Sequence, residues 1–145
     1  MAPVGIVQRG GPSNTRAFAV RLAPGSDLRK TLEDFFSQEK LSAAGVVSAV
    51  GSLSSSTIRL ANAKESKTIE GPLEIVSLSG TLSTDGAHLH IAVADTVGQT
   101  TGGHLLEGCK VYTTVEVVIL ELTDLKFTRD QDSATGFREL VIRSK

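Results

Sequence analysis

The sequence predicts an α+β domain, in which a mostly antiparallel β-sheet of about six to eight strands carries one main amphipathic helix. A single segment near the N-terminus places apolar residues at helical spacing, whereas the chain after it consists of alternating or β-branched stretches separated by turn residues. The length of 145 residues, with 40% hydrophobic and 21% charged residues, is typical of one globular domain and excludes a disordered chain.

The start of the chain divides into an expected lead-in and the domain proper. Residues 1–15 are rich in glycine and proline and are expected to be irregular, so a single domain is predicted over residues 16–145. Residues 16–22 alternate between polar and apolar side chains and predict the first strand, which Pro24 and Gly25 would end.

The helix is expected at residues 27–40. Ser26 or Asp27 can accept hydrogen bonds from the free amide groups of its first turn. Charged residues occupy one side of this segment, opposite an apolar stripe that would face the sheet. The stripe consists of Leu28, Leu32, Phe35 and Phe36.

The rest of the chain is predicted to form strands. The alternating or β-branched stretches are residues 45–51, 57–60, 73–82, 87–94, 111–122 and 137–142. Residues 52–56 are expected to form a turn, and residues 64–67 and 124–136 are expected to be polar connections.

The three histidines of the chain all fall between positions 88 and 104. His88 and His90 are two residues apart on a predicted strand, so their side chains leave the same face. Residues 95–99 fit a three-residue hairpin loop in which Gly98 takes a left-handed conformation. That loop would place His90 opposite His104, and all three imidazoles would converge.

Two alternatives to this register remain open from the sequence. A two-residue loop at residues 97–98 would place His104 opposite Ile91 and direct it to the other face. The adjacent Gly102 and Gly103 could also form a bulge that changes the register.

Three convergent imidazoles predict a metal site at His88, His90 and His104. This donor set suits zinc with one coordination position left for water or a ligand, and zinc lowers the pKa of bound water to about 7. The alternative is that the histidines are partly exposed sheet residues that make ordinary hydrogen bonds.

Two carboxylates are weak candidates for handling protons at such a site. Glu116 lies in a strand that is apolar on both faces, so it could assist a metal ligand, contact another subunit or pair with an arginine. Asp95 is most simply explained as shaping its turn. Arg59 is expected on a solvated face, and Cys109 lacks a spare histidine that could activate it as a nucleophile.

Charge and composition also bear on partners and location. The net charge of −1 and the 4% aromatic content weigh against a nucleic-acid surface. The single cysteine favours a reducing compartment, and no apolar run reaches the length of a membrane span. We therefore expect a cytoplasmic protein that does not enter a membrane.

Several segments resemble the plants-and-prokaryotes conserved (PPC) domain. The stretch at residues 71–80 is similar to that family's Gly-x-Phe-Glu-Ile-Leu-Ser-Leu-x-Gly pattern. The resemblance runs from about residue 16 to residue 143. Further matching segments are residues 22–28, 48–53, 88–90, 102–104, 115–117 and 136–140.

The resemblance implies an α+β fold, assembly as a homotrimer and a metal, usually assigned as zinc, at His88, His90 and His104. The resulting expectation is a trimeric module that acts in assembly or in binding a small ligand. One alternative is a zinc-dependent hydrolase or hydratase. Another is a DNA-binding or chromatin-associated protein, by analogy with nuclear plant relatives that carry AT-hook motifs, although this chain has no Arg-Gly-Arg-Pro core.

Overall fold

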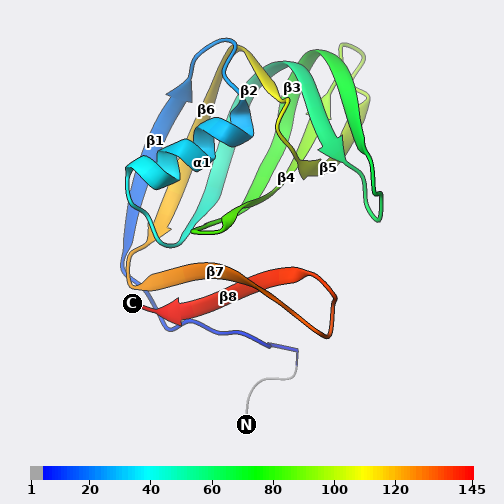
Figure 1. Ribbon diagram of the computed structural model, residues 1–145. Coiled ribbons are helices and arrows are strands. Elements are labelled where there is room, and N and C mark those ends of the chain that lie inside the picture. The colour runs from blue at the N-terminus through cyan, green and yellow to red at the C-terminus, as the bar shows by residue number, and fades with distance from the viewer. Residues whose placement is uncertain (1–4) are drawn as a thin grey trace.

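The computed structural model describes residues 5–145, so the first four residues of the expected irregular lead-in lie outside it. Residues 5–145 form one α-helix and eight β-strands, which is the α+β fold that the sequence predicts (Figure 1). Six strands form an antiparallel sheet in the order β1-β6-β2-β3-β4-β5, and β7 and β8 form a separate ribbon. The strands are β1 (Thr15–Leu22), β2 (Ala44–Arg59), β3 (Ser66–Ser83), β4 (Gly86–Ala94), β5 (Thr100–Leu105), β6 (Lys110–Leu122), β7 (Leu125–Gln131) and β8 (Arg138–Ser144).

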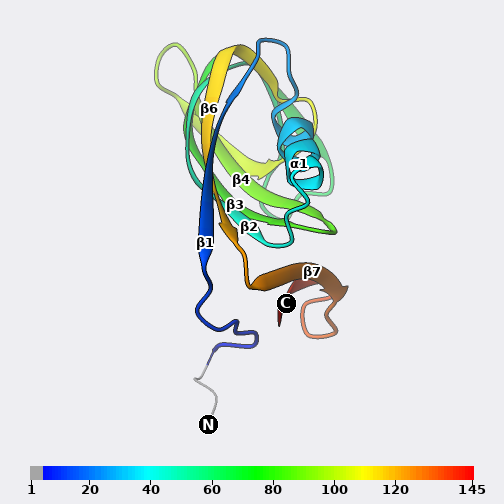
Figure 2. The same ribbon diagram turned by 90° about the vertical axis from the view of Figure 1, so that its left-hand side faces the viewer.

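The helix α1 (Leu28–Gln38) covers one face of the sheet (Figure 2). Asp27 caps its N-terminus by accepting a 3.0 Å hydrogen bond from the amide of Lys30. The helix is shorter than expected at its C-terminus, because Lys40 adopts a left-handed φ of 54°. Three residues of the predicted apolar stripe are buried against the sheet, namely Leu28, Leu32 and Phe36.

The opposite face of the sheet is not covered by the helix (Figure 2). Alternate residues of β6 point to this side, and they include Tyr112 and Glu116, both exposed. Val50 of β2 lies directly opposite Glu116 and is 58% exposed. Val111, Val115 and Val117 of β6 point the other way and are buried, as the two-residue period of a strand requires.

The turn predicted at residues 52–56 is wrong, because β2 runs through it. This strand pairs with β3 on one side and β6 on the other, and irregularities in both pairings near Leu53 let it bend without ending. Leu53 and Ser56 are fully buried. The serine-rich composition predicts a turn, but the side chain of Ser56 is buried within the sheet.

The polar connection predicted at residues 124–136 is also wrong, because it contains β7. Leu125 and Phe127 of this strand are buried and form a small core with residues of β8. The amide of Thr84, in the β3–β4 turn, donates a 3.2 Å hydrogen bond to the carbonyl oxygen of Phe127. The ribbon is therefore anchored at the end of the sheet where β4 begins.

The edge strand β5 returns to β2. Ile58 pairs with Leu105, and Arg59 pairs with His104, so β2, β3, β4 and β5 form a closed circuit of neighbouring strands. Residues 5–145 contain no helix long and apolar enough to cross a membrane.

Candidate metal centre

The loop between β4 and β5 fixes the register of the histidines. The amide of Asp95 donates a 3.0 Å hydrogen bond to the carbonyl oxygen of Gln99, and Gly98 has a left-handed φ of 81°. Glycine adopts this conformation without the penalty that a side chain would impose. His90 consequently lies directly opposite His104, so the three-residue loop is confirmed and the two-residue alternative is wrong.

The three histidines converge on one side of the sheet. The ring centroids are 5.1 Å apart for His88 and His90, 5.7 Å for His88 and His104, and 4.7 Å for His90 and His104. Each ring offers a nitrogen such that the three nitrogens lie within 4.8 Å of one another. His88 and His90 are exposed and His104 is half-buried, so the group is open to solvent.

The surroundings favour the neutral form of two of these imidazoles. Partial desolvation of its ring lowers the pKa of His88, and the positive charge of Arg129 lowers it further. Burial likewise lowers the pKa of His104, with a further contribution from Arg59. Neutral imidazole is the form that binds metal ions, so the lowered pKa values of His88 and His104 favour metal binding by these two residues.

The helix supports the histidine-bearing strands from the other face of the sheet. Arg29 donates from Nη1 to the carbonyl oxygen of Leu105 at 2.7 Å and from Nη2 to that of Ala87 at 3.0 Å. Glu33 accepts a 3.0 Å hydrogen bond from the amide of Ala87 and lies 3.1 Å from Arg29 Nη2. Ala87 and Leu105 are adjacent in sequence to histidines of the cluster, so this pair fixes the backbone beside them.

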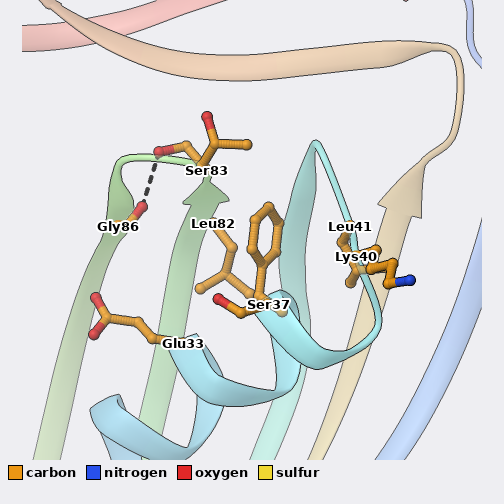
Figure 3. A pocket seen from close by; sticks show the side chains of 9 residues that line it. Glu33, Ser37, Lys40, Leu41, Leu82, Ser83 and Gly86 are labelled. Atoms are coloured by element: carbon orange, nitrogen blue, oxygen red, sulfur yellow. Dashed lines mark hydrogen bonds between the residues drawn. The ribbon is translucent and has the colours of Figure 1, made fainter.

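A hollow of about 360 Å³ lies beside the Arg29–Glu33 pair, between the C-terminal half of α1 and the β3–β4 turn (Figure 3). Glu33 lies at its rim next to Gly86, while Leu82 forms part of its floor. Ser83 donates a 2.9 Å hydrogen bond to the carbonyl oxygen of Gly86 and closes the turn. The hollow and the histidines lie on opposite faces of the sheet.

Two arginines that sequence reasoning did not assign to the site lie beside it. Arg59 was expected on a solvated face, but it is half-buried and directly opposite His104. Arg129 lies on β7 and donates from Nη2 to Thr81 Oγ1 at 3.1 Å. The sequence predicts a polar connection for the segment that contains Arg129, so no signal in the sequence places this residue near His88.

The two candidate carboxylates lie away from the histidines. Glu116 is exposed on β6, which β2 and β3 separate from β4 in the sheet. Asp95 accepts hydrogen bonds from the amides of Val97 and Gln99 at 3.0 and 2.9 Å, which holds the hairpin loop. The carboxylate whose charge does act on His88 is that of Glu139 on β8, which the sequence did not reveal.

The buried acidic residue of β6 is Glu121, not Glu116. Its side chain is 3% exposed and accepts a 2.6 Å hydrogen bond from Arg16 Nε, the residue directly opposite on β1. The period of two along β6 places residue 121 on the same face as the buried Val117 and Ile119. That period was the signal that could have identified it.

Cys109 is a packing residue. It is fully buried, and its Sγ lies 3.3 Å from both the amide nitrogen and the carbonyl oxygen of Thr57. Burial raises the pKa of its thiol, which disfavours the reactive thiolate. This environment agrees with the expectation that Cys109 is not a nucleophile.

The chain belongs to the Plants and Prokaryotes Conserved (PCC) domain family, whose model matches residues 9–123. A hypothetical protein from Salmonella cholerae-suis is 39% identical, with a TM-score of 0.92 over 94% of this chain and 99% of that chain. A metal-containing protein from Archaeoglobus fulgidus is 30% identical, with a TM-score of 0.77 over 87% of this chain and 93% of its own. A plant- and prokaryote-conserved (PPC) protein from Pyrococcus horikoshii is 25% identical, with a TM-score of 0.74 over 91% and 97% of the two chains.

Curated relatives are much longer. The protein described as bifunctional protein GlmU from Synechococcus sp. (strain JA-3-3Ab) is 50% identical over 127 residues, which make up 88% of this chain. The chain spans about a fifth of the length of the curated relatives that it matches. The likeness is therefore to one portion of those proteins.

The chemistry of the histidine cluster fits a divalent metal ion. The group supplies three nitrogen donors, and imidazole is a ligand that zinc, copper, iron and nickel accept. His88, His90 and His104 could therefore hold a metal ion.

Proposed function

We propose that this PCC-domain protein is a homotrimer that binds one zinc ion per chain through His88, His90 and His104, and that it acts in assembly or in binding a small ligand. The observation that carries the metal assignment is the approach of three imidazole nitrogens to within 4.8 Å. Three neutral nitrogen ligands fit zinc, and such a set leaves a coordination position open for a ligand. The likeness to the metal-containing protein of Archaeoglobus fulgidus supports the proposal.

When bound, zinc would supply a Lewis acid that can polarise a ligand oxygen. The chain's own residues would hold and orient that ion, because the hairpin loop fixes the register of His90 with His104. Arg29 and Glu33 hold the backbone beside His88 and His104. Outer partners of this kind restrict the orientations that metal-binding side chains can adopt.

The metal proposal is tested by titrating metal-free protein with zinc in competition with a chromophoric chelator. We expect one equivalent per chain, and loss of high-affinity binding in His104→Ala. Thr101→Ala, on the same strand, is the matched control and should bind like the wild type. Equal zinc affinity in His104→Ala and the wild type would refute the proposal.

The trimer is supported by the sheet face that α1 leaves uncovered. Val47, Val50, Val76 and Tyr112 are 53–61% exposed on β2, β3 and β6. Exposed apolar residues gathered on one sheet are typical of a surface that another protein covers. In a symmetric homo-oligomer, that other protein is a further copy of the chain.

Light scattering tests the assembly. The expected mass is three times that of the 15.2 kDa chain. Val50→Glu places a second carboxylate opposite Glu116 and should dissociate the assembly, whereas Val97→Glu, in the exposed hairpin loop, should leave it intact. A wild-type mass equal to one chain would refute the trimer.

A further inference from the structure

Two arginine side chains flank the three histidines. Arg59 on β2 is directly opposite His104, so the two side chains leave the same face with Cβ atoms about 5 Å apart. Arg129 on β7 donates from Nη2 to Thr81 Oγ1 at 3.1 Å, and Thr81 is directly opposite His88. One guanidinium group therefore lies on the β2 side of the cluster and the other on the β3 side.

Neither guanidinium group forms a salt bridge within residues 5–145. Arg59 donates a 3.3 Å hydrogen bond to the carbonyl oxygen of Ala63, and Nε of Arg129 is buried without a partner in that same range. The other charged groups that act on Arg129 are Glu139 and Arg138, whose charges oppose each other. Both arginines therefore retain positive charge and donor capacity for a further group.

A metal ion at the cluster would add positive charge without compensation from its ligands. The three imidazoles are neutral when they bind a metal, and no carboxylate or thiolate is part of the group. Proteins seldom leave several positive charges together unless an anion joins them. The open coordination position on the metal and the two arginines thus both favour an anionic ligand.

We propose that the site binds a small oxyanion, a carboxylate or phosphate group, which completes the metal coordination and is held by Arg59 and Arg129. This inference rests on the proposed metal site and names the ligand class of that site. Guanidinium groups bind planar or tetrahedral oxyanions through paired N–H donors, which a lysine cannot reproduce. A carboxylate or phosphate oxygen is also a suitable ligand for the remaining position on zinc.

The proposal is tested on protein loaded with Co²⁺ in place of zinc, because the visible spectrum of Co²⁺ responds to a change in its ligands. Inorganic phosphate and acetate are titrated separately as probes. We expect saturable spectral changes with at least one of them, and the tighter probe identifies the group that the site prefers. Arg59→Gln and Arg129→Gln should each weaken that binding by about tenfold or more, and the double variant should weaken it further.

Control variants separate the local effect from a general change in charge. Arg143→Gln removes an exposed arginine of the same ribbon, and Arg21→Gln removes one from the far edge of the sheet. Both should bind the oxyanion like the wild type. Arg129→Lys keeps the charge but loses the paired donors, so it should bind more weakly than the wild type even though the fold is preserved.

The outcomes distinguish this inference from the metal proposal on which it rests. Failure of Co²⁺ to bind at the histidines would refute the metal site and the inference with it. Normal Co²⁺ binding without any spectral response to either probe would refute the oxyanion inference alone. Oxyanion binding that both arginine variants preserve would refute the assignment of Arg59 and Arg129.

Discussion

Arg29 donates a 2.7 Å hydrogen bond from Nη1 to the carbonyl oxygen of Leu105, the residue that follows His104. Its Nη2 donates to the carbonyl oxygen of Ala87, which precedes His88, at 3.0 Å. The backbone pairing of β4 with β5 ends at the pair His90 and His104. The guanidinium group therefore joins the two strands at the point where their own pairing stops.

Replacement of Arg29 by methionine is expected to weaken zinc binding by about tenfold or more, because the backbone beside two donors loses its restraint. The two carbonyl oxygens would also lose their partner, which should cost about 1–3 kcal/mol of unfolding free energy. Chelator competition measures the first effect and urea unfolding the second.

Lys30→Met on the same helix is the control for Arg29→Met. Lys30 is exposed and pairs with Asp34 on the surface of the helix, so its loss should change neither quantity. Wild-type zinc affinity in Arg29→Met would show that the helix does not position the histidines.

Gly80 allows β3 to approach the strand that carries His88. Its φ is 139°, and a Cβ atom at this position would lie 2.0 Å from the carbonyl oxygen of His88. Gly80→Ala should therefore lower the unfolding free energy by about 2–4 kcal/mol and reduce the zinc content, because the pairing beside His88 must shift. Urea unfolding and metal analysis provide the readouts.

Gly11 offers the matched control for Gly80, because a Cβ atom at Gly11 would meet no atom within 4 Å. Gly11→Ala should retain both the stability and the zinc content of the wild type. An equally harmless Gly80→Ala would contradict the close approach of β3 and β4 at this point.

The metal-free protein should lose stability as the pH falls below about 6.5. Burial lowers the pKa values of His88 and His104 below 6.5, so the unfolded chain takes up protons before the folded one does. Protonation therefore favours unfolding, and this effect is absent well above pH 6.5. Urea unfolding of protein kept metal-free by a chelator, carried out between pH 5 and 8, measures how the unfolding free energy changes with pH.

The double variant His88→Asn/His104→Asn removes both titrating groups and should show a shallower loss of stability on acidification. A slope equal to that of the wild type would assign the pH dependence to other residues.

The hairpin that carries the histidines was predictable because local chemistry determines it. Asp95 and Gly98 supply the side-chain acceptor and the left-handed residue that a three-residue loop needs, and the period of two then places the histidines on one face. The helix was predictable for the same reason, from its cap at Asp27 and its apolar stripe.

The arginines of the site could not be predicted because their positions depend on contacts between distant segments. Arg59 approaches His104 only because β5 returns to β2, and Arg129 approaches Thr81 only because the ribbon folds back to the end of the sheet. The sequence of β7 combines Leu125 and Phe127 with polar neighbours, and its predominantly polar second half concealed the strand. Arg29 likewise looked like an exposed residue of an amphipathic helix.

The central claim is that His88, His90 and His104 hold a metal ion, and the metal content of the purified protein tests it most directly. Elemental analysis should find one metal ion per chain in the wild type and none in His90→Ala. Ser79→Ala, which alters the exposed residue directly opposite His90, should retain the metal. An absence of metal from the wild type, or undiminished metal in His90→Ala, would contradict the account.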